Sequence, residues 1–287
     1  MNALTIDVEE YYHGLEFEAA VGAEGRTQLP SRVEESVDRV LRVLGTTSRR
    51  GTFFVLGCVA REHPAMVRRI AAAGHEVACH GDAHELVTRQ TPAEFRADVH
   101  RARRSLEDIV GEAVIGYRAP NYSITARTPW AFDILLDEGF RYDSSVYPIY
   151  HDRYGFPGAP RFPHLLRDGE DGPLWEFPLA TVRLFGLNLP IGGGGIFRLF
   201  PYHVFRAGIR RVNRRDGQGV VFYFHPWELD PGQPRPPMPL MHRFRHYARL
   251  HRAEAKVARL LSEVPFAPIR DAMAPLLKAA PAAEARG

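Results

Sequence analysis

Short apolar runs that suit buried strands alternate along this chain with longer segments whose apolar residues recur at helical spacing. The alternation predicts parallel strands covered by helices, and it therefore constrains the fold to the α/β class. The strand-like runs lie at residues 4–8, 51–56, 76–79, 114–117, 140–143, 175–178, 220–224 and 266–269. The helix-like segments lie at residues 31–44, 64–73, 91–110, 128–138, 201–214 and 240–261.

The alternation stops between residues 144 and 190, where proline, glycine, tyrosine and histidine are dense. We expect a long insertion here that covers one face of the fold, either as a lid or as the wall of a groove. Four consecutive glycines at 192–195 allow the backbone to approach a ligand or a neighbouring segment closely. We predict a single domain over residues 1–273, with an insertion at 144–195, and a disordered tail over 274–287.

Composition excludes several classes of function. The chain of 287 residues is 45% hydrophobic and 25% charged, with a net charge of +3, and its arginine pairs are scattered, so we expect no nucleic-acid partner. There is no apolar run of about 18 residues, so we expect no membrane span. Acidic residues follow the first strand where a signal peptide would need an apolar run, which favours a cytoplasmic enzyme.

Polar side chains follow the predicted strands at the points where they end. In parallel β/α folds these ends share one face, where catalytic residues collect. Two histidines four positions apart in the loop after residue 79 could converge on one metal ion, although two loop histidines also occur together by chance. A zinc-type ion would need a third protein ligand and an open position for water. The polar residues at these ends are Asp7, Glu9, His80, His84, Arg118 and Asp143.

The order of these motifs resembles that of the NodB-type polysaccharide deacetylases, carbohydrate esterase family 4. The resemblance rests on five segments spread over residues 3 to 270. Three features resemble a subgroup associated with exosortase-type exopolysaccharide systems: Asp7-Val8-Glu9 in the first segment, the glycines followed by Phe197-Arg198, and the run from His225 to Glu228. The five segments are Thr5-Ile6-Asp7, His80-Gly81-Asp82-Ala83-His84, Arg118-Ala119-Pro120, Asp143-Ser144-Ser145 and Phe224-His225.

The resemblance implies a distorted (β/α) barrel with about seven parallel strands, and a divalent metal, zinc by preference with cobalt or nickel as alternatives. His80 and His84 would be metal ligands and Asp7 the general base. Arg118 would form an ion pair that keeps Asp7 ionised and oriented. His225 would be the general acid, and Asp143 would hold it protonated and oriented.

The third metal ligand departs from the family pattern. The usual first motif has two adjacent aspartates, of which the second binds the metal, whereas this chain has Val8 there. Glu9 is our candidate, because relatives with Asp-Val-Asp use the second acid. Side chains alternate along a strand, so a turn after Val8 could instead aim Glu10 or Asp7 at the ion. A degraded metal site in a protein that only binds glycan is the remaining alternative.

The resulting hypothesis is a metal-dependent hydrolase that removes N-acetyl or O-acetyl groups from a polysaccharide or a lipid-linked oligosaccharide in exopolysaccharide biosynthesis. Tyr122 and Trp227 are candidates for stacking on sugar rings. Two alternatives stay open: an amidase or imidase that opens a small cyclic substrate, and a catalytically silent glycan-binding protein. The sequence does not indicate an oligomeric state.

Overall fold

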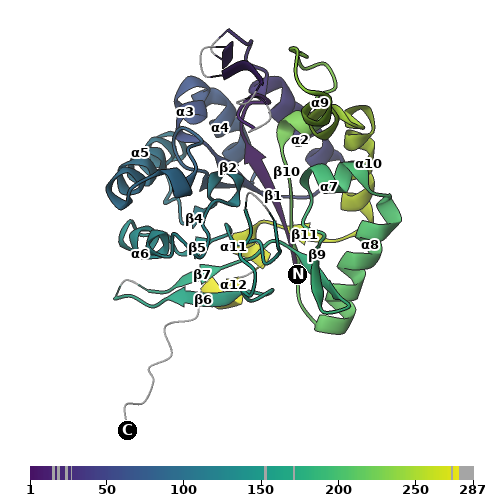
Figure 1. The fold of residues 1–287 in the computed structure, drawn as a ribbon. Coiled ribbons are helices and arrows are strands. Elements are labelled where there is room, and N and C mark those ends of the chain that lie inside the picture. The colour runs from purple at the N-terminus through teal and green to yellow at the C-terminus, as the bar shows by residue number, and fades with distance from the viewer. Residues whose placement is uncertain are drawn as a thin grey trace.

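The computed structural model describes the chain except for residues 15, 16, 18, 19, 23, 24, 27, 152, 153, 171, 273 and 278–287. A nine-stranded sheet in the order β10-β1-β2-β3-β4-β5-β7-β6, with β11 beside β1, forms its centre (Figure 1). Pairing is parallel from β10 to β7 and antiparallel between β7 and β6. The strands of this sheet are β1 (Asn2–Val8), β2 (Thr52–Val55), β3 (Glu76–Cys79), β4 (Gly116–Tyr117), β5 (Tyr142–Asp143), β6 (His164–Arg167), β7 (Leu174–Glu176), β10 (Val221–Phe224) and β11 (Phe266–Ala267).

The sheet curls into a distorted barrel, which confirms the expected fold class. Two isolated parallel bridges, Leu179 with Val221 and Gly193 with Tyr223, connect segments that follow β7 back to β10. These two contacts are single bridges, whereas β1 and β2 share a continuous ladder of four residue pairs.

The helices cover the outside of the sheet (Figure 1). The longest, α5, begins at a capping box between Thr91 and Glu94. No helix in the described part of the chain is long and apolar enough to cross a membrane. The helices are α2 (Val33–Thr47), α3 (Gly57–Glu62), α4 (Pro64–Ala72), α5 (Pro92–Val110), α6 (Trp130–Asp137), α7 (Gly194–Leu199), α8 (Tyr202–Arg211), α9 (Leu240–Tyr247), α10 (Leu250–Glu263), α11 (Ile269–Ala272) and α12 (Ala274–Leu277).

Three expectations need correction. The helix expected at 240–261 is two helices, because Arg249 adopts a left-handed conformation with φ of 60° between α9 and α10. The insertion contains more strands than the predicted run at 175–178: besides β7 it contains β6 and a hairpin of β8 (Thr181–Leu184) and β9 (Leu187–Pro190). The tail is helical over Ala274–Leu277, because Leu276 and Leu277 pack against the core; residues 278–287 lie outside the described residues.

The glycine run at 192–195 serves close backbone packing. Gly193 has a φ of 128°, and a Cβ atom there would lie 1.9 Å from the carbonyl oxygen of Tyr223. Gly194 has a φ of 58°, and a Cβ atom there would lie 2.5 Å from the Tyr223 hydroxyl oxygen. The run therefore lets the chain pass against β10 just before α7.

We predict that Gly193→Ala lowers the free energy of unfolding by about 2–4 kcal/mol, because the new Cβ atom forces both a strained φ and a backbone clash. Gly45→Ala is the matched control. Gly45 lies inside α2 with open space around it, so alanine there should stabilise the protein by about 0.5–1 kcal/mol. Urea denaturation followed by circular dichroism measures both changes. Equal stability of the two variants would contradict the prediction.

Candidate active site

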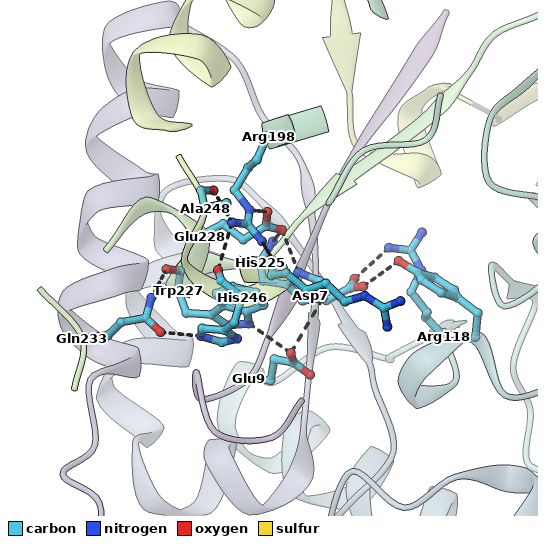
Figure 2. Close-up of polar contacts among 12 residues, drawn as sticks. Asp7, Glu9, Arg118, Arg198, His225, Trp227, Glu228, Gln233, His246 and Ala248 are labelled. Carbon is cyan, nitrogen blue, oxygen red and sulfur yellow. Dashed lines mark hydrogen bonds and ion pairs between the residues drawn. The ribbon is translucent and has the colours of Figure 1, made fainter. Parts of the chain in front are cut away.

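A cavity of about 340 Å³ opens at the carboxyl ends of the parallel strands. Asp7 is the second-last residue of β1, and Glu9 follows that strand directly. His80 follows β3, and His225 follows β10. The polar contacts of this region are drawn in Figure 2. Seven of the predicted site residues line the same cavity: Asp7, Glu9, His80, His84, Tyr122, His225 and Trp227.

Glu9, His80 and His84 form a group that could hold a metal ion, since one ligand atom from each lies within 4.8 Å of the others. Glu9 Oε2 is 2.6 Å from His84 Nε2, and both side chains are buried. His80 Nδ1 donates to the carbonyl oxygen of Arg118 at 2.8 Å, which leaves its Nε2 lone pair free for a ligand. Two imidazoles and a carboxylate, with a fourth position for water, suit a catalytic zinc-type ion.

The electrostatics of this group also suit a cation. Burial lowers the pKa of His80 to about 4, so its imidazole is neutral at physiological pH, as a metal ligand must be. Burial alone would raise the pKa of Glu9, but His84 and His225 outweigh burial and hold it far below its usual range. Glu9 is therefore an ionised carboxylate, 4% exposed, that lies beside the imidazole rings of His84 and His225.

Glu10 is engaged elsewhere. Its carboxylate accepts hydrogen bonds from the backbone amides of Arg32 and Val33 at 3.1 and 3.2 Å, and from the Ser31 hydroxyl. Glu10 thus caps the N-terminus of α2, a position that favours negative charge. Val8 is fully buried in the main hydrophobic core. These placements favour Glu9 over Glu10 as the third ligand.

The loop that carries both histidines is held from several sides. Asp82 is paired with Arg61 at 2.6 Å and with Arg101 at 2.8 Å, and its amide donates to Asp98 at 2.9 Å. His84 has a φ of 61°, an uncommon conformation for a residue that is not glycine. Such a conformation persists only where surrounding contacts impose it, which is common at functional sites.

Asp7 and Arg118 form the predicted ion pair. Arg118 Nη1 is 2.7 Å from Asp7 Oδ1, and the guanidinium group is completely buried. The other carboxylate oxygen of Asp7 accepts a hydrogen bond of 3.2 Å from the Tyr122 hydroxyl. Arg118 also donates to Thr5 Oγ1 at 2.7 Å and to Ser144 Oγ at 2.8 Å. Asp7 is therefore an oriented carboxylate whose remaining lone pairs face the cavity.

The assignment of Asp143 as the partner of His225 is wrong. Asp143 accepts hydrogen bonds from the Ser145 amide and hydroxyl at 3.0 and 2.6 Å and forms a side-chain hydrogen bond with Glu176. Burial raises the pKa of both of these carboxyl groups. His225 Nδ1 instead lies 2.8 Å from Glu228 Oε1 (Figure 2). The role that the family resemblance gives to Asp143 is filled by Glu228.

Glu228 is fixed by a second buried charge. Its other oxygen pairs with Arg198 Nε, and both side chains are nearly inaccessible to solvent. Burial alone would raise the pKa of Glu228, but Arg198 and His225 lower it to about 2. Burial alone would lower the pKa of His225, but Glu9 and Glu228 outweigh it and raise this pKa to about 9. His225 is therefore an imidazolium at neutral pH, ready to donate a proton.

The two predicted sugar-stacking residues have other contacts. Trp227 donates from its indole nitrogen to Glu9 Oε1 at 3.1 Å and stacks on His225 and His246, with ring centroids 5.1 and 4.4 Å apart. Since Trp227 is only 9% exposed, it orients Glu9 rather than offering a face to a sugar. Tyr122 is 6% exposed and presents its hydroxyl to Asp7.

Three residues of the site were not assigned a role from the sequence: Glu228, Arg198 and His246. The spacing of Glu228 was the signal that could have found it. Glu228 lies three residues after His225, and the 3-10 turn between them brings its carboxylate back to the imidazole. His246 lines the cavity and donates from Nε2 to Gln233 Oε1 at 2.6 Å, since the amide nitrogen of Gln233 is occupied by two carbonyls. No local pattern indicates that His246 reaches this site.

The insertion contributes to the cavity wall through His151 and Tyr154. These two rings stack with centroids 3.8 Å apart, and Tyr154 also stacks against Tyr147. Part of the insertion over 144–190 is thus a wall of the cavity.

Fold and site together define an α/β barrel with a metal-type ligand group, an oriented carboxylate and an imidazolium around one cavity. Residues 24–136 match the family model described as polysaccharide deacetylase, a match that includes His80, His84 and Arg118. Residues 144–274 match a model described as a domain of unknown function (DUF3473). Over residues 24–136 the chain is thus similar to the polysaccharide deacetylases.

Curated relatives match only part of the chain. A chitooligosaccharide deacetylase of Bradyrhizobium sp. (strain ANU 289) is 34% identical over 96 residues, 33% of this chain and 42% of that protein. The peptidoglycan deacetylase of Helicobacter pylori is 28% identical over 113 residues, 39% of this chain and 38% of that protein. The chain therefore spans less than half the length of these relatives. They are hydrolases that act on carbon–nitrogen bonds other than peptide bonds.

Solved structures share the fold. A protein from Mycobacterium smegmatis assigned to the polysaccharide deacetylases aligns over 97% of this chain and 91% of its own, with a TM-score of 0.62 and 23% identity. A CE4 family pseudoenzyme from Bacillus anthracis aligns over 95% of this chain and 65% of its own, with a TM-score of 0.50 and 15% identity. At these identities the alignments concern the fold alone.

We predict that Glu9→Gln weakens zinc binding at least about tenfold, because it removes an anionic ligand from the group, and that His80→Ala abolishes it. Glu10→Gln is the matched control, since it makes the same chemical change one residue away at the α2 cap. Isothermal titration calorimetry with zinc should give about one equivalent for the parent and for Glu10→Gln. Stronger loss in Glu10→Gln than in Glu9→Gln would exchange the two assignments.

We predict that Glu228→Gln lowers the pKa of His225 from about 9 toward 6.5, whereas Asp143→Asn leaves it near 9. Because the pKa in the folded protein exceeds 6.5, charged His225 stabilises the fold fully below pH 6.5, and this contribution is lost as pH rises through 9. Histidine NMR shifts of the metal-free protein, titrated with pH, measure the effect. A pKa that responds to Asp143→Asn and not to Glu228→Gln would restore the original assignment.

Proposed function

We propose that this protein is a metal-dependent deacetylase that hydrolyses N-acetyl groups on a glycan. The observation that carries the proposal is the convergence of a ligand group, a carboxylate base and an imidazolium acid on one cavity. Amide hydrolysis needs these three functions together: a polarised carbonyl, an activated water and a proton for the departing nitrogen.

A divalent ion held by Glu9, His80 and His84 would supply Lewis-acid polarisation of the acetyl carbonyl and a binding position for water. Asp7 is placed to remove a proton from that water, with Arg118 and Tyr122 fixing its orientation. The water oxygen then bonds to the carbonyl carbon. As the carbon–nitrogen bond breaks, His225 gives its proton to the amine, so the products are acetate and a free amino sugar.

The surrounding residues prepare this proton donor. Glu228 and Glu9 keep His225 charged at neutral pH, and Arg198 keeps Glu228 ionised. An acid that is protonated before the substrate arrives needs no proton from solvent during the reaction. The pair Glu228–Arg198 therefore acts as a positioning unit for His225.

The role in exopolysaccharide biosynthesis, on a polymer or a lipid-linked oligosaccharide, rests on the subgroup resemblance of the glycine run with Phe197-Arg198 and of the run from His225 to Glu228. Both motifs lie within residues 144–274, the segment whose family model has no assigned function. The proposal includes N-acetyl groups as the substrate, with O-acetyl groups as the alternative. It also includes zinc as the native metal and a cytoplasmic location.

Acetate release from an N-acetylglucosamine oligomer by the zinc-loaded protein tests the proposal. We predict that Asp7→Asn abolishes release and that His225→Ala lowers kcat by about 10²–10⁴, the usual contribution of general acid catalysis. His100→Ala, which changes an exposed histidine on α5, is the control and should keep the parent rate. Zinc binding without acetate release would instead favour a cyclic amide substrate or a glycan-binding protein.

A further inference from the structure

Helix α9 turns an apolar face to solvent. Leu240, Met241 and Phe244 are 84%, 61% and 57% exposed, although leucine, methionine and phenylalanine usually avoid water. Phe244 lies three residues after Met241 and four after Leu240, which places the three side chains on one side of the helix. His246 and Tyr247, on another side, are buried. We name Leu240, Met241 and Phe244 the α9 face.

The segment around the α9 face carries only positive charge. Between residues 231 and 253 there are five arginines and no aspartate or glutamate. In the part of the chain that the structure describes, none of these arginines forms an ion pair with an acidic side chain. The five are Arg235, Arg243, Arg245, Arg249 and Arg252.

The α9 face adjoins the catalytic cavity. Arg245 and His246, which belong to the same helix, line the cavity. Figure 1 places α9 at the end of the barrel toward which β1 points, the end that carries the site residues. A surface bound to α9 would therefore lie beside the cavity entrance.

We propose that the α9 face docks on a membrane surface that bears anionic lipid headgroups. Exposed apolar side chains flanked by arginines are typical of helices that lie in a lipid interface, where the apolar groups enter the acyl boundary and the cations meet the headgroups. A second copy of this chain is a poor partner for the same face, because a twofold interface would bring arginines opposite arginines. Docking of this kind does not depend on the proposed deacetylase activity.

Co-sedimentation with lipid vesicles tests the proposal without any activity assay. The parent protein should bind vesicles with about 30% phosphatidylglycerol at least about tenfold more strongly than pure phosphatidylcholine vesicles, and high salt should weaken this binding. The triple variant Leu240→Ser, Met241→Ser, Phe244→Ser should lose at least about tenfold in partitioning. Arg243→Glu reverses the charge at an exposed position and leaves the three apolar side chains in place, so it should also weaken binding.

The β8–β9 hairpin supplies the matched control. Phe185 and Leu187 are 95% and 56% exposed on this hairpin, so Phe185→Ser with Leu187→Ser removes similar apolar surface elsewhere. This variant should bind anionic vesicles like the parent. The proposal is overturned if the parent does not bind anionic vesicles, if it binds neutral ones equally well, or if the α9 variants bind like the parent. An equal loss in the hairpin variant would also overturn it, because adhesion would then follow exposed apolar area alone. Circular dichroism confirms that each variant is folded.

Discussion

The rest of the site depends on the contacts of Arg118. Its guanidinium is completely buried and is held by Asp7, Thr5 and Ser144, while its carbonyl oxygen accepts the Nδ1 proton of His80. One residue thus orients the proposed base, Asp7, and sets the tautomer of the proposed metal ligand, His80. Removing one partner of such a buried ion pair typically costs about 3–5 kcal/mol, because the remaining charge is left unpaired in the interior. A change at Arg118 would therefore affect the fold and the chemistry together.

The sequence predicted what depends on periodicity and order along the chain. The alternation of strands and helices sets which end of each strand meets the others, so Asp7, His80 and His84 were placed on one face correctly. Glu9 was chosen from the resemblance to relatives with Asp-Val-Asp, and it lies on the side of the cavity, whereas Val8 is buried in the core. The pattern of the chain was enough for Asp7 and the two histidines, because these side chains lie at a strand end or in the loop just after it.

Contacts between segments that are far apart in the chain could not be predicted in this way. Asp143 follows a strand end like the others, but its carboxylate is taken up by Ser145 and Glu176, and Glu228 reaches His225 from the next turn. The break between α9 and α10 has no glycine or proline to signal it. It is stabilised from outside, since Arg198 donates to the carbonyl oxygens of Arg245, His246 and Ala248, which the end of α9 leaves free.

Arg198 therefore has two tasks that the fold joins in one buried guanidinium. Its Nε pairs with Glu228, the partner of His225, and its two terminal nitrogens cap the C-terminus of α9, where a cation is favoured. Helix α9 and Glu228, the partner of His225, thus both contact the guanidinium group of Arg198. Because one guanidinium group contacts both the carbonyl oxygens at the end of α9 and the Glu228 carboxylate, the position of α9 and the orientation of the carboxylate beside His225 depend on the same side chain. The structure in this way connects the outer surface beside the cavity to the protonated imidazole inside it.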